Sequence, residues 1–93
     1  MLTFEWDLKK AKSNEQKHGI NFHEASTVFA DSLSLTICDP LHSDDEKRFI
    51  IIGISYRNRI LTVVHTAFDD NIRIISARKA TKKERSYYEH YEK

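Results

Sequence analysis

Apolar residues recur with two different periods along the 93-residue chain, and the periods predict two kinds of element. In LTFEWD, residues 2–7, apolar and polar side chains alternate, which is typical of a half-buried strand. Segments rich in Ile, Val, Leu and Thr, separated by short polar turns, predict four more strands in an antiparallel meander. These segments are residues 33–38, 48–56, 60–67 and 71–78.

Helix signals flank the predicted strands. Gly19 is the stop signal of a mostly polar first helix. Asn21 with Glu24 three residues later resembles a capping box and starts a second, short helix. Thr81 and Glu84 repeat that pattern before a final segment without helix breakers. The predicted helices span residues 8–18, about 22–30 and about 82–91.

The predicted order of elements is strand, helix, helix, four strands, helix. This order favours an α+β fold, in which an antiparallel sheet of four to five strands carries two N-terminal helices and one C-terminal helix. The length of 93 residues allows one small core, so we expect residues 1–93 to form a single domain.

Composition indicates a globular protein in a reducing compartment. Hydrophobic residues make up 40% of the chain and charged residues 31%, as in ordinary soluble domains. Cys38 is the sole cysteine, and packing is its expected role. The N-terminus lacks a secretory signal, and the longest apolar run, FIIIGI at 49–54, is far shorter than the roughly 20 residues of a transmembrane helix. We therefore expect a cytoplasmic protein without membrane contact.

The charges are unevenly distributed although the net charge is only +1. Residues 73–85 contain six basic residues and one acid, whereas residues 39–46, DPLHSDDE, contain four acids and no Lys or Arg. Lys10, Asn14 and Lys17 fall on one face of the first predicted helix. Such clusters either build a strong potential on one surface or are simply solvated faces.

Strand alternation assigns faces to the candidate chemical groups. His65 shares a face with Leu61 and Val63, and it is either a hydrogen-bonded histidine at the edge of the core or a group for proton transfer or phosphate contact. Arg73 falls on the opposite face from Arg78, although a bulge near the strand end would re-aim one of them. The same alternation pairs Arg73 with Ile75 and Ala77, and Arg78 with Ile72, Ile74 and Ser76.

The histidines and Cys38 show no paired spacing typical of metal ligands, so we expect neither metal nor cofactor. The remaining Lys, Arg, His and Tyr side chains suit RNA cleavage without a cofactor, because the ribose 2′-hydroxyl is itself the nucleophile. Such cleavage needs a base, cations that stabilise the phosphoryl charge, and a proton donor. The tyrosines of the last helix either pack on the sheet, stack on bases or dock on a partner chain. The candidates are His65, Arg73, Arg78, Lys79, Tyr87 and Tyr88.

Three stretches of the chain resemble, in the same order, the BrnT family of type II toxins. They are FEWDLKKAKSNEQKHGINFHEA (4–25), LTVVHT (61–66) and RIISARKATKKERSYYE (73–89). The resemblance implies a RelE-like fold and a ribonuclease that inhibits translation. It also implies a BrnA-type antitoxin with a ribbon-helix-helix segment, in a two-plus-two assembly that contacts operator DNA only through the antitoxin.

The resemblance also suggests roles for individual residues. The family motif falls on Lys10, Asn14, Lys17, His18, His65, Thr66, Arg73, Ser76, Arg78, Lys79, Thr81 and Glu84. We expect Arg73 and Arg78 to stabilise phosphate charge and His65 or Lys79 to transfer a proton. The expected RNA-binding residues are Lys10, Lys17, Lys82, Lys83 and Tyr87.

Two positions depart from the family pattern. Leu8 replaces a common proline, and Phe68 replaces a common arginine near His65. A first-turn proline merely pre-sets helical φ, so the exchange at Leu8 changes little. Phe68 favours an alternative function, a non-catalytic module of the same fold that binds an antitoxin or nucleic acid.

Overall fold

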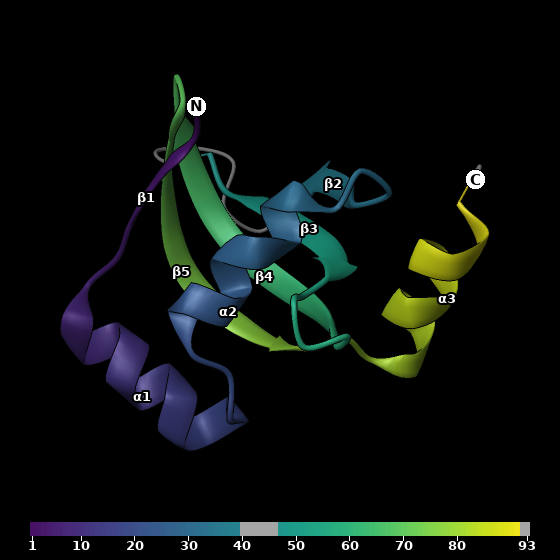
Figure 1. Ribbon diagram of the computed structural model, residues 1–93, viewed down its shortest axis with the longest axis horizontal. Coiled ribbons are helices and arrows are strands. Elements are labelled where there is room, and N and C mark those ends of the chain that lie inside the picture. Colours follow the sequence, from purple (N-terminus) through teal and green to yellow (C-terminus); the bar gives the residue numbers. More distant parts are fainter. Residues whose placement is uncertain (40–46, 92–93) are drawn as a thin grey trace.

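The computed structural model of the chain describes residues 1–39 and 47–91 (Figure 1). The acidic stretch at 39–46 is thus described at Asp39 alone. The predicted turn that contains Asp44 and Asp45 lies outside the described residues.

The order of the described elements follows the prediction. They are β1 (Thr3–Glu5), α1 (Leu8–His18), α2 (Phe22–Thr27), the 3₁₀ helix η1 (Val28–Ala30), β2 (Leu35–Cys38), β3 (Phe49–Ile54), β4 (Ile60–Phe68), β5 (Asn71–Lys79) and α3 (Lys82–His90). The predicted helix over 22–30 is divided between α2 and η1. Within the described residues, none of the helices is long and apolar enough to span a membrane.

The strands form one sheet in the order β1-β5-β4-β3-β2. Neighbouring strands from β2 to β5 are antiparallel, as the meander predicts. The expectation of a purely antiparallel sheet is wrong for β1, which pairs with β5 in parallel. No hairpin joins these two strands, because most of the chain lies between them, so their relative direction has no local sequence signal.

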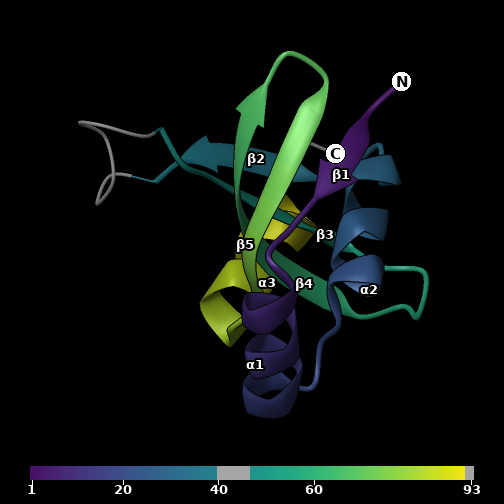
Figure 2. The same ribbon diagram turned by 90° about the vertical axis from the view of Figure 1, so that its left-hand side faces the viewer.

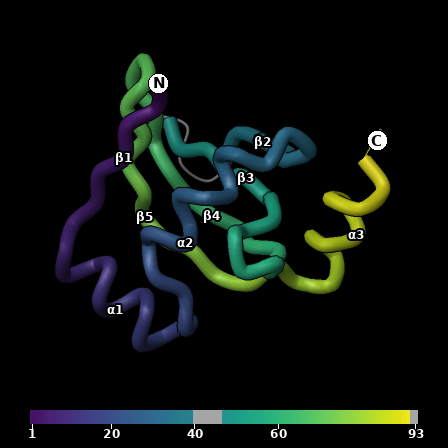
Figure 3. The backbone as a smooth tube through the Cα atoms, in the orientation of Figure 1, coloured from purple at the N-terminus to yellow at the C-terminus, as the bar shows by residue number. Residues whose placement is uncertain are grey.

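Helices cover both faces of the sheet. Figure 2 shows α2 and α3 on opposite sides of the strands, and α1 and α2 both pack against β5 whereas α3 packs against β3. The hydrophobic core lies between the sheet and α2. Its buried residues are Ile20, Phe22, Ala25, Val28, Ile51, Leu61, Val63, Ile72, Ile74 and Ala77. The tube in Figure 3 shows that α1 and α3 lie far apart across the molecule.

Capping contacts mark the end of α1 and the start of α3, as the sequence predicts. The Gly19 residue that ends α1 has φ 71°, a left-handed conformation that glycine adopts without steric cost. The Thr81 side chain accepts a hydrogen bond from the Glu84 N–H, and the Glu84 carboxylate accepts one from the Thr81 N–H, which completes the capping box of α3.

A β-bulge interrupts the pairing of β4 with β5. Val64 lies opposite Ser76, whereas the next residue, His65, lies opposite Ile74. Ile75 is therefore an extra residue without a partner on β4. An extra residue reverses the alternation of side chains on one side of the bulge.

The bulge corrects the predicted faces of β5. Arg73 and Arg78 lie opposite Thr66 and Thr62, which share one face of β4, so both arginines lie on the same face of the sheet. Ala77 is buried in the core on the other face, and the expectation that it accompanies Arg73 is wrong.

Cys38 also departs from the prediction. It is an exposed free cysteine at the end of β2, so the expected packing role is wrong. The reason is its position on an edge strand, which has a neighbour on one side only.

Candidate functional site

The bulge gathers three polar residues of β5 on one face of the sheet. Arg73, Ser76 and Arg78 define this surface, which we name the arginine face. Both guanidinium groups are accessible, with side chains 50% and 41% exposed respectively. Ser76 lies between the two arginines and opposite Val64. The surface between the two cations is therefore formed by small side chains and is only weakly polar.

Arg73 occupies the end of the arginine face next to β1. Its guanidinium forms an ion pair with the Glu5 carboxylate at 3.6 Å, and the Glu5 side chain is also about half exposed, at 51%. Exposed pairs of this kind contribute at most about 1 kcal/mol. This ion pair therefore holds Arg73 only weakly.

Arg78 is held more firmly by α3. Its two terminal nitrogens donate to the two Glu84 carboxylate oxygens at 2.7 and 2.9 Å. Glu84 also accepts a hydrogen bond from the Thr62 hydroxyl at 3.0 Å. The hydrogen bonds from Arg78 are the main reason why the pKa of Glu84 falls to about 2. Arg78 is thus at once a cation of the arginine face and an anchor for α3.

A pocket of about 220 Å³ adjoins the arginine face at the edge of β5. Ser76 belongs to both, so the pocket meets the arginine face at this residue. Its lining residues are Lys10, Ser13, Asn14, Lys17, His18, Ile75 and Ser76, and we name it the α1 pocket. The expectation that Lys10, Asn14 and Lys17 share a helix face is confirmed.

His18 lines the α1 pocket but was not among the residues predicted for catalysis. Histidine is the side chain that most often transfers protons in active sites. The sequence signal that pointed to it was its position between Lys17 and the helix stop at Gly19, within the family motif. That signal did not distinguish it from a capping residue.

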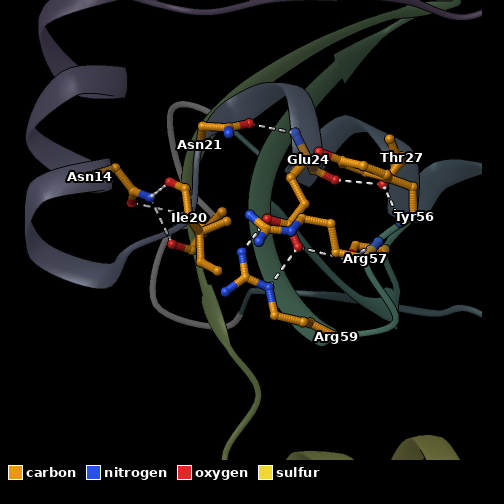
Figure 4. A network of polar contacts seen from close by, with 10 residues as sticks. Asn14, Ile20, Asn21, Glu24, Thr27, Tyr56, Arg57 and Arg59 are labelled. Atoms are coloured by element: carbon orange, nitrogen blue, oxygen red, sulfur yellow. Dashed lines mark hydrogen bonds and ion pairs between the residues drawn. The ribbon is translucent and has the colours of Figure 1, made fainter.

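Asn14 is buried and makes structural contacts, which Figure 4 shows. Its Nδ2 donates to the carbonyl oxygens of Ile20 at 3.0 Å and Ala77 at 2.8 Å. Its Oδ1 accepts from the Ala77 N–H at 3.1 Å. Because β1 pairs only with Asn71 to Arg73, Asn14 takes the place of a neighbouring strand farther along β5.

His65 lies on the other face of the sheet. Its side chain is 3% exposed and packs between the rings of Phe29 and Phe49, with centroids 4.8 and 5.8 Å away. Burial lowers the pKa of His65, so the imidazole is neutral at pH 7. The structure therefore does not bring His65 together with Arg73 and Arg78.

Lys79 is also separated from the arginine face. It lies opposite the core residue Leu61 at the end of β5, and its side chain lines a different pocket. The four predicted catalytic residues thus divide into two pairs on opposite faces of the sheet: Arg73 with Arg78, and His65 with Lys79.

The predicted RNA-binding residues of α3 are exposed. Lys82 and Lys83 belong to its first turn, and the Lys83 ammonium lies 6.0 Å from the centre of the Tyr87 ring, at the limit of a cation–π contact. Tyr88 is buried, and its hydroxyl donates to the Asp31 carboxylate at 2.6 Å. Burial and this hydrogen bond raise the pKa of Tyr88 to about 12. Of the alternatives considered for the tyrosines, packing inside the protein is the one that Tyr88 adopts.

Phe68 extends the arginine face beyond Arg73. It lies opposite Asn71 at the end of β4, on the side that carries Thr66, and is 79% exposed. The face therefore combines cations with an exposed aromatic ring. Among the described residues, no three His, Cys, Asp or Glu side chains form a group that could hold a metal ion.

Comparisons with known proteins give the family of the chain and support its fold. Residues 6–84 match the family model described as the ribonuclease toxin, BrnT, of type II toxin–antitoxin systems. Among solved structures, the Brucella abortus ribonuclease toxin BrnT is similar, with a TM-score of 0.63 and 21% sequence identity. The match covers 88% of this chain and 100% of that chain, and it supports the α+β fold. The curated proteins contain no match. Because the family model spans most of the sequence, this chain belongs to the BrnT family of ribonuclease toxins of type II toxin–antitoxin systems.

Proposed function

We propose that this chain is a metal-independent endoribonuclease that cleaves RNA on the arginine face and thereby inhibits translation. The observation that carries the proposal is the bulge at Ile75, which places Arg73 and Arg78 on one accessible face. The α1 pocket with its cations and imidazole adjoins this face at Ser76. A RelE-like classification of the fold stays a prediction of the resemblance.

The proposed reaction uses the 2′-hydroxyl of the RNA as nucleophile. The 2′-oxygen forms a bond to phosphorus, the bond from phosphorus to the 5′-oxygen breaks, and a cyclic phosphate results. Arg73 and Arg78 would stabilise the charge on the phosphoryl oxygens. A base removes the 2′-hydroxyl proton and an acid protonates the departing 5′-oxygen.

For proton transfer we favour His18 over His65 and Lys79. His18 lines the α1 pocket next to Ser76, whereas His65 is buried on the other face. Lys10 and Lys17 of the same pocket would bind backbone phosphates. Lys82 and Lys83 would bind phosphates separately, at the start of α3. Tyr87 and Phe68 are exposed rings on which bases can stack.

One observation favours the alternative of a non-catalytic binding module. Both arginines of the arginine face already pair with carboxylates, Arg73 with Glu5 and Arg78 with Glu84. A guanidinium that keeps its carboxylate partner gives less charge to a transition state. The two functions differ in what the Arg73→Ala substitution removes: cleavage in an enzyme, affinity and its salt dependence in a binding module.

The test is cleavage of a single-stranded RNA by the purified chain. We expect cleavage by the wild type and losses of about 10²-fold or more in Arg73→Ala and His18→Ala. Arg57→Ala removes an exposed cation of the β3–β4 turn and serves as control. Arg78→Lys is preferred to Arg78→Ala because it keeps a cation beside Glu84.

Growth provides the matching measurement in cells. Induced expression of the wild type should arrest growth with loss of RNA, and Arg73→Ala should not. A folded wild-type chain that leaves RNA intact and growth unaffected would exclude the proposed enzyme and favour the binding module.

A type II toxin has a cognate antitoxin, and we propose that the partner here is a BrnA-like protein with a ribbon-helix-helix segment. Its binding would stabilise this small domain by mass action. Purification of the chain with the product of a neighbouring gene tests this partner. Operator DNA should bind the complex and not the isolated toxin.

A further inference from the structure

A second basic surface lies away from the arginine face. A pocket of about 260 Å³ is lined by Asn58, Arg59, Ile60, Lys79 and Arg85, and we name it the basic pocket. It lies where the β3–β4 turn, the last residue of β5 and the first half of α3 meet. Three of its five lining residues carry a positive charge.

One of these cations is fixed in place. Arg59 donates from Nε to the Glu24 carboxylate at 2.9 Å, and a terminal nitrogen forms an ion pair with the same carboxylate (Figure 4). Glu24 is completely buried, so the guanidinium is attached to the core. A guanidinium has five N–H donors, so Arg59 keeps donors for a ligand in the pocket.

The other two cations have no side-chain partner among residues 1–39 and 47–91. In the part of the chain that the structure describes, the Lys79 ammonium and the Arg85 guanidinium form no ion pair or hydrogen bond with another side chain. Because Lys79 and Arg85 line the same pocket, an anion bound there could interact with both positive charges. The basic pocket is thus built for a negatively charged group.

The dimensions of the pocket favour a phosphate over a larger anion. Its volume lies just below the roughly 300–1,000 Å³ of small-molecule sites, so a phosphodiester with part of its sugar fits. Guanidinium and ammonium groups are the usual partners of phosphate oxygens. Asn58, a residue with a neutral side-chain donor, also lines the pocket.

The position relative to the arginine face suggests which phosphate binds. Lys79 directly follows Arg78 in β5, but the two residues lie on opposite faces of the sheet. A nucleic-acid strand that leaves the arginine face at Arg78 and passes around the junction of β5 with α3 would reach the basic pocket. An RNA that continues beyond the cleaved bond can therefore contact both sites.

We propose that the basic pocket binds a backbone phosphate of the substrate RNA, several nucleotides from the bond cleaved on the arginine face. The inference rests on the proposed function, because RNA is the ligand of both surfaces. It also removes Lys79 from the catalytic group and makes it, with Arg85, a residue that holds the strand beyond the cleavage site.

The experiment measures binding of a 12-nucleotide 2′-O-methyl RNA, which cannot be cleaved, by fluorescence anisotropy at several salt concentrations. The slope of log K against log salt is negative, and Lys79→Gln with Arg85→Gln should make it less steep by about 0.7 for each phosphate that the pocket no longer binds. The double variant Lys79→Arg with Arg85→Lys conserves both charges, so its slope should be close to that of the wild type. Lys12→Gln with Lys47→Gln removes the same charge from exposed residues outside the basic and α1 pockets and should leave the slope nearly unchanged.

Three results would overturn the inference. If Lys79→Gln with Arg85→Gln has the wild-type slope, while the wild type cleaves RNA, the inference about the basic pocket is wrong and the proposed function stands. If the wild type neither binds nor cleaves RNA, both the inference about the basic pocket and the proposed function are wrong. The third result concerns a 12-residue poly-glutamate peptide. If the wild type binds this peptide, and Lys79→Gln with Arg85→Gln loses that binding but keeps RNA binding, the pocket binds an acidic protein segment instead.

Discussion

The carboxylate of Glu84 joins the start of α3 to the guanidinium of Arg78 on the sheet. It accepts hydrogen bonds from both terminal nitrogens of Arg78 and from the Thr81 N–H of its own capping box. The Thr62 hydroxyl of β4 also donates to it. Because one side chain both caps the helix and holds it on the sheet, the position of α3 depends on the ionised form of Glu84.

This dependence predicts a loss of stability in acid. The pKa of Glu84 is lowered from 4.5 to about 2 in the folded chain, so its contribution is complete above pH 4.5 and is lost as the pH falls towards 2. Glu84→Gln should cost about 1–2 kcal/mol at pH 7, since Arg78 is partly exposed and solvent screens the pair. At pH 2 the difference from the wild type should largely vanish. Urea unfolding at pH 7, 4 and 2 measures both values.

Glu89→Gln is the matched control for Glu84→Gln. Glu89 lies on the same helix, is exposed, and makes no ion pair with another described residue. Its substitution should leave the free energy of unfolding within about 0.5 kcal/mol of the wild type. Equal pH profiles for the two variants would contradict the anchoring role of Glu84.

The buried pair of Glu24 and Arg59 predicts a larger effect. Glu24 is fully buried, and hydrogen bonds from Arg59 are the main cause of its lowered pKa. Arg59→Met would leave a buried carboxylate whose one remaining side-chain donor is the Ser55 hydroxyl, at 2.7 Å, so a cost of about 3–5 kcal/mol in unfolding free energy is expected. Urea denaturation at pH 7 measures this cost.

The double variant Glu24→Leu with Arg59→Leu tests whether Arg59→Met is destabilising because it leaves the Glu24 charge buried without a partner. It removes both charges at once and should recover much of the stability that Arg59→Met loses. Arg57→Met is the control on the same turn. If Arg59→Met unfolds at the same urea concentration as Arg57→Met, the pair does not hold α2 to the β3–β4 turn.

Local signals were readable from the sequence, and Asn21 with Glu24 shows both their value and their limit. The Asn21 side chain accepts from the Glu24 N–H at 2.7 Å, which confirms the helix start. The Glu24 side chain does not complete the capping box, because it turns inward to Arg59, 35 residues away in the sequence. A capping pattern is decided within one turn, whereas this ion pair depends on the packing of α2 against the sheet.

The candidate site shows the same limit. Alternation correctly placed His65 with Leu61 and Val63, but it did not reveal that α2 covers this face. The common face of Arg73 and Arg78 depends on the extra residue at Ile75, and a bulge is fixed by the pairing with β4. The basic residues could therefore be selected from the sequence, but their division between two faces could not.

Asn14 is predicted to support the fold and not to contact RNA. Asn14→Leu would leave the N–H and C=O of Ala77 and the C=O of Ile20 without their side-chain partner. We expect a loss of about 2–4 kcal/mol in unfolding free energy, because these groups are buried. Ser13→Ala, in the same pocket, is the control. A variant of Asn14 that keeps full stability but loses RNA binding would reverse this assignment.

His65 allows the clearest separation of a structural from a catalytic histidine. Burial lowers its pKa, so the folded chain loses stability as the pH falls below the unfolded value of about 6.5 and continues to lose it until the folded pKa is reached. His65→Phe keeps an aromatic ring between Phe29 and Phe49 and should reduce this dependence between pH 7 and 5. The same variant should cleave RNA within about 3-fold of the wild type, whereas His18→Ala should lose about 10²-fold. Cleavage rates and urea unfolding are measured for both variants. If His65→Phe folds but does not cleave RNA, His65 and not His18 is the residue that transfers the proton.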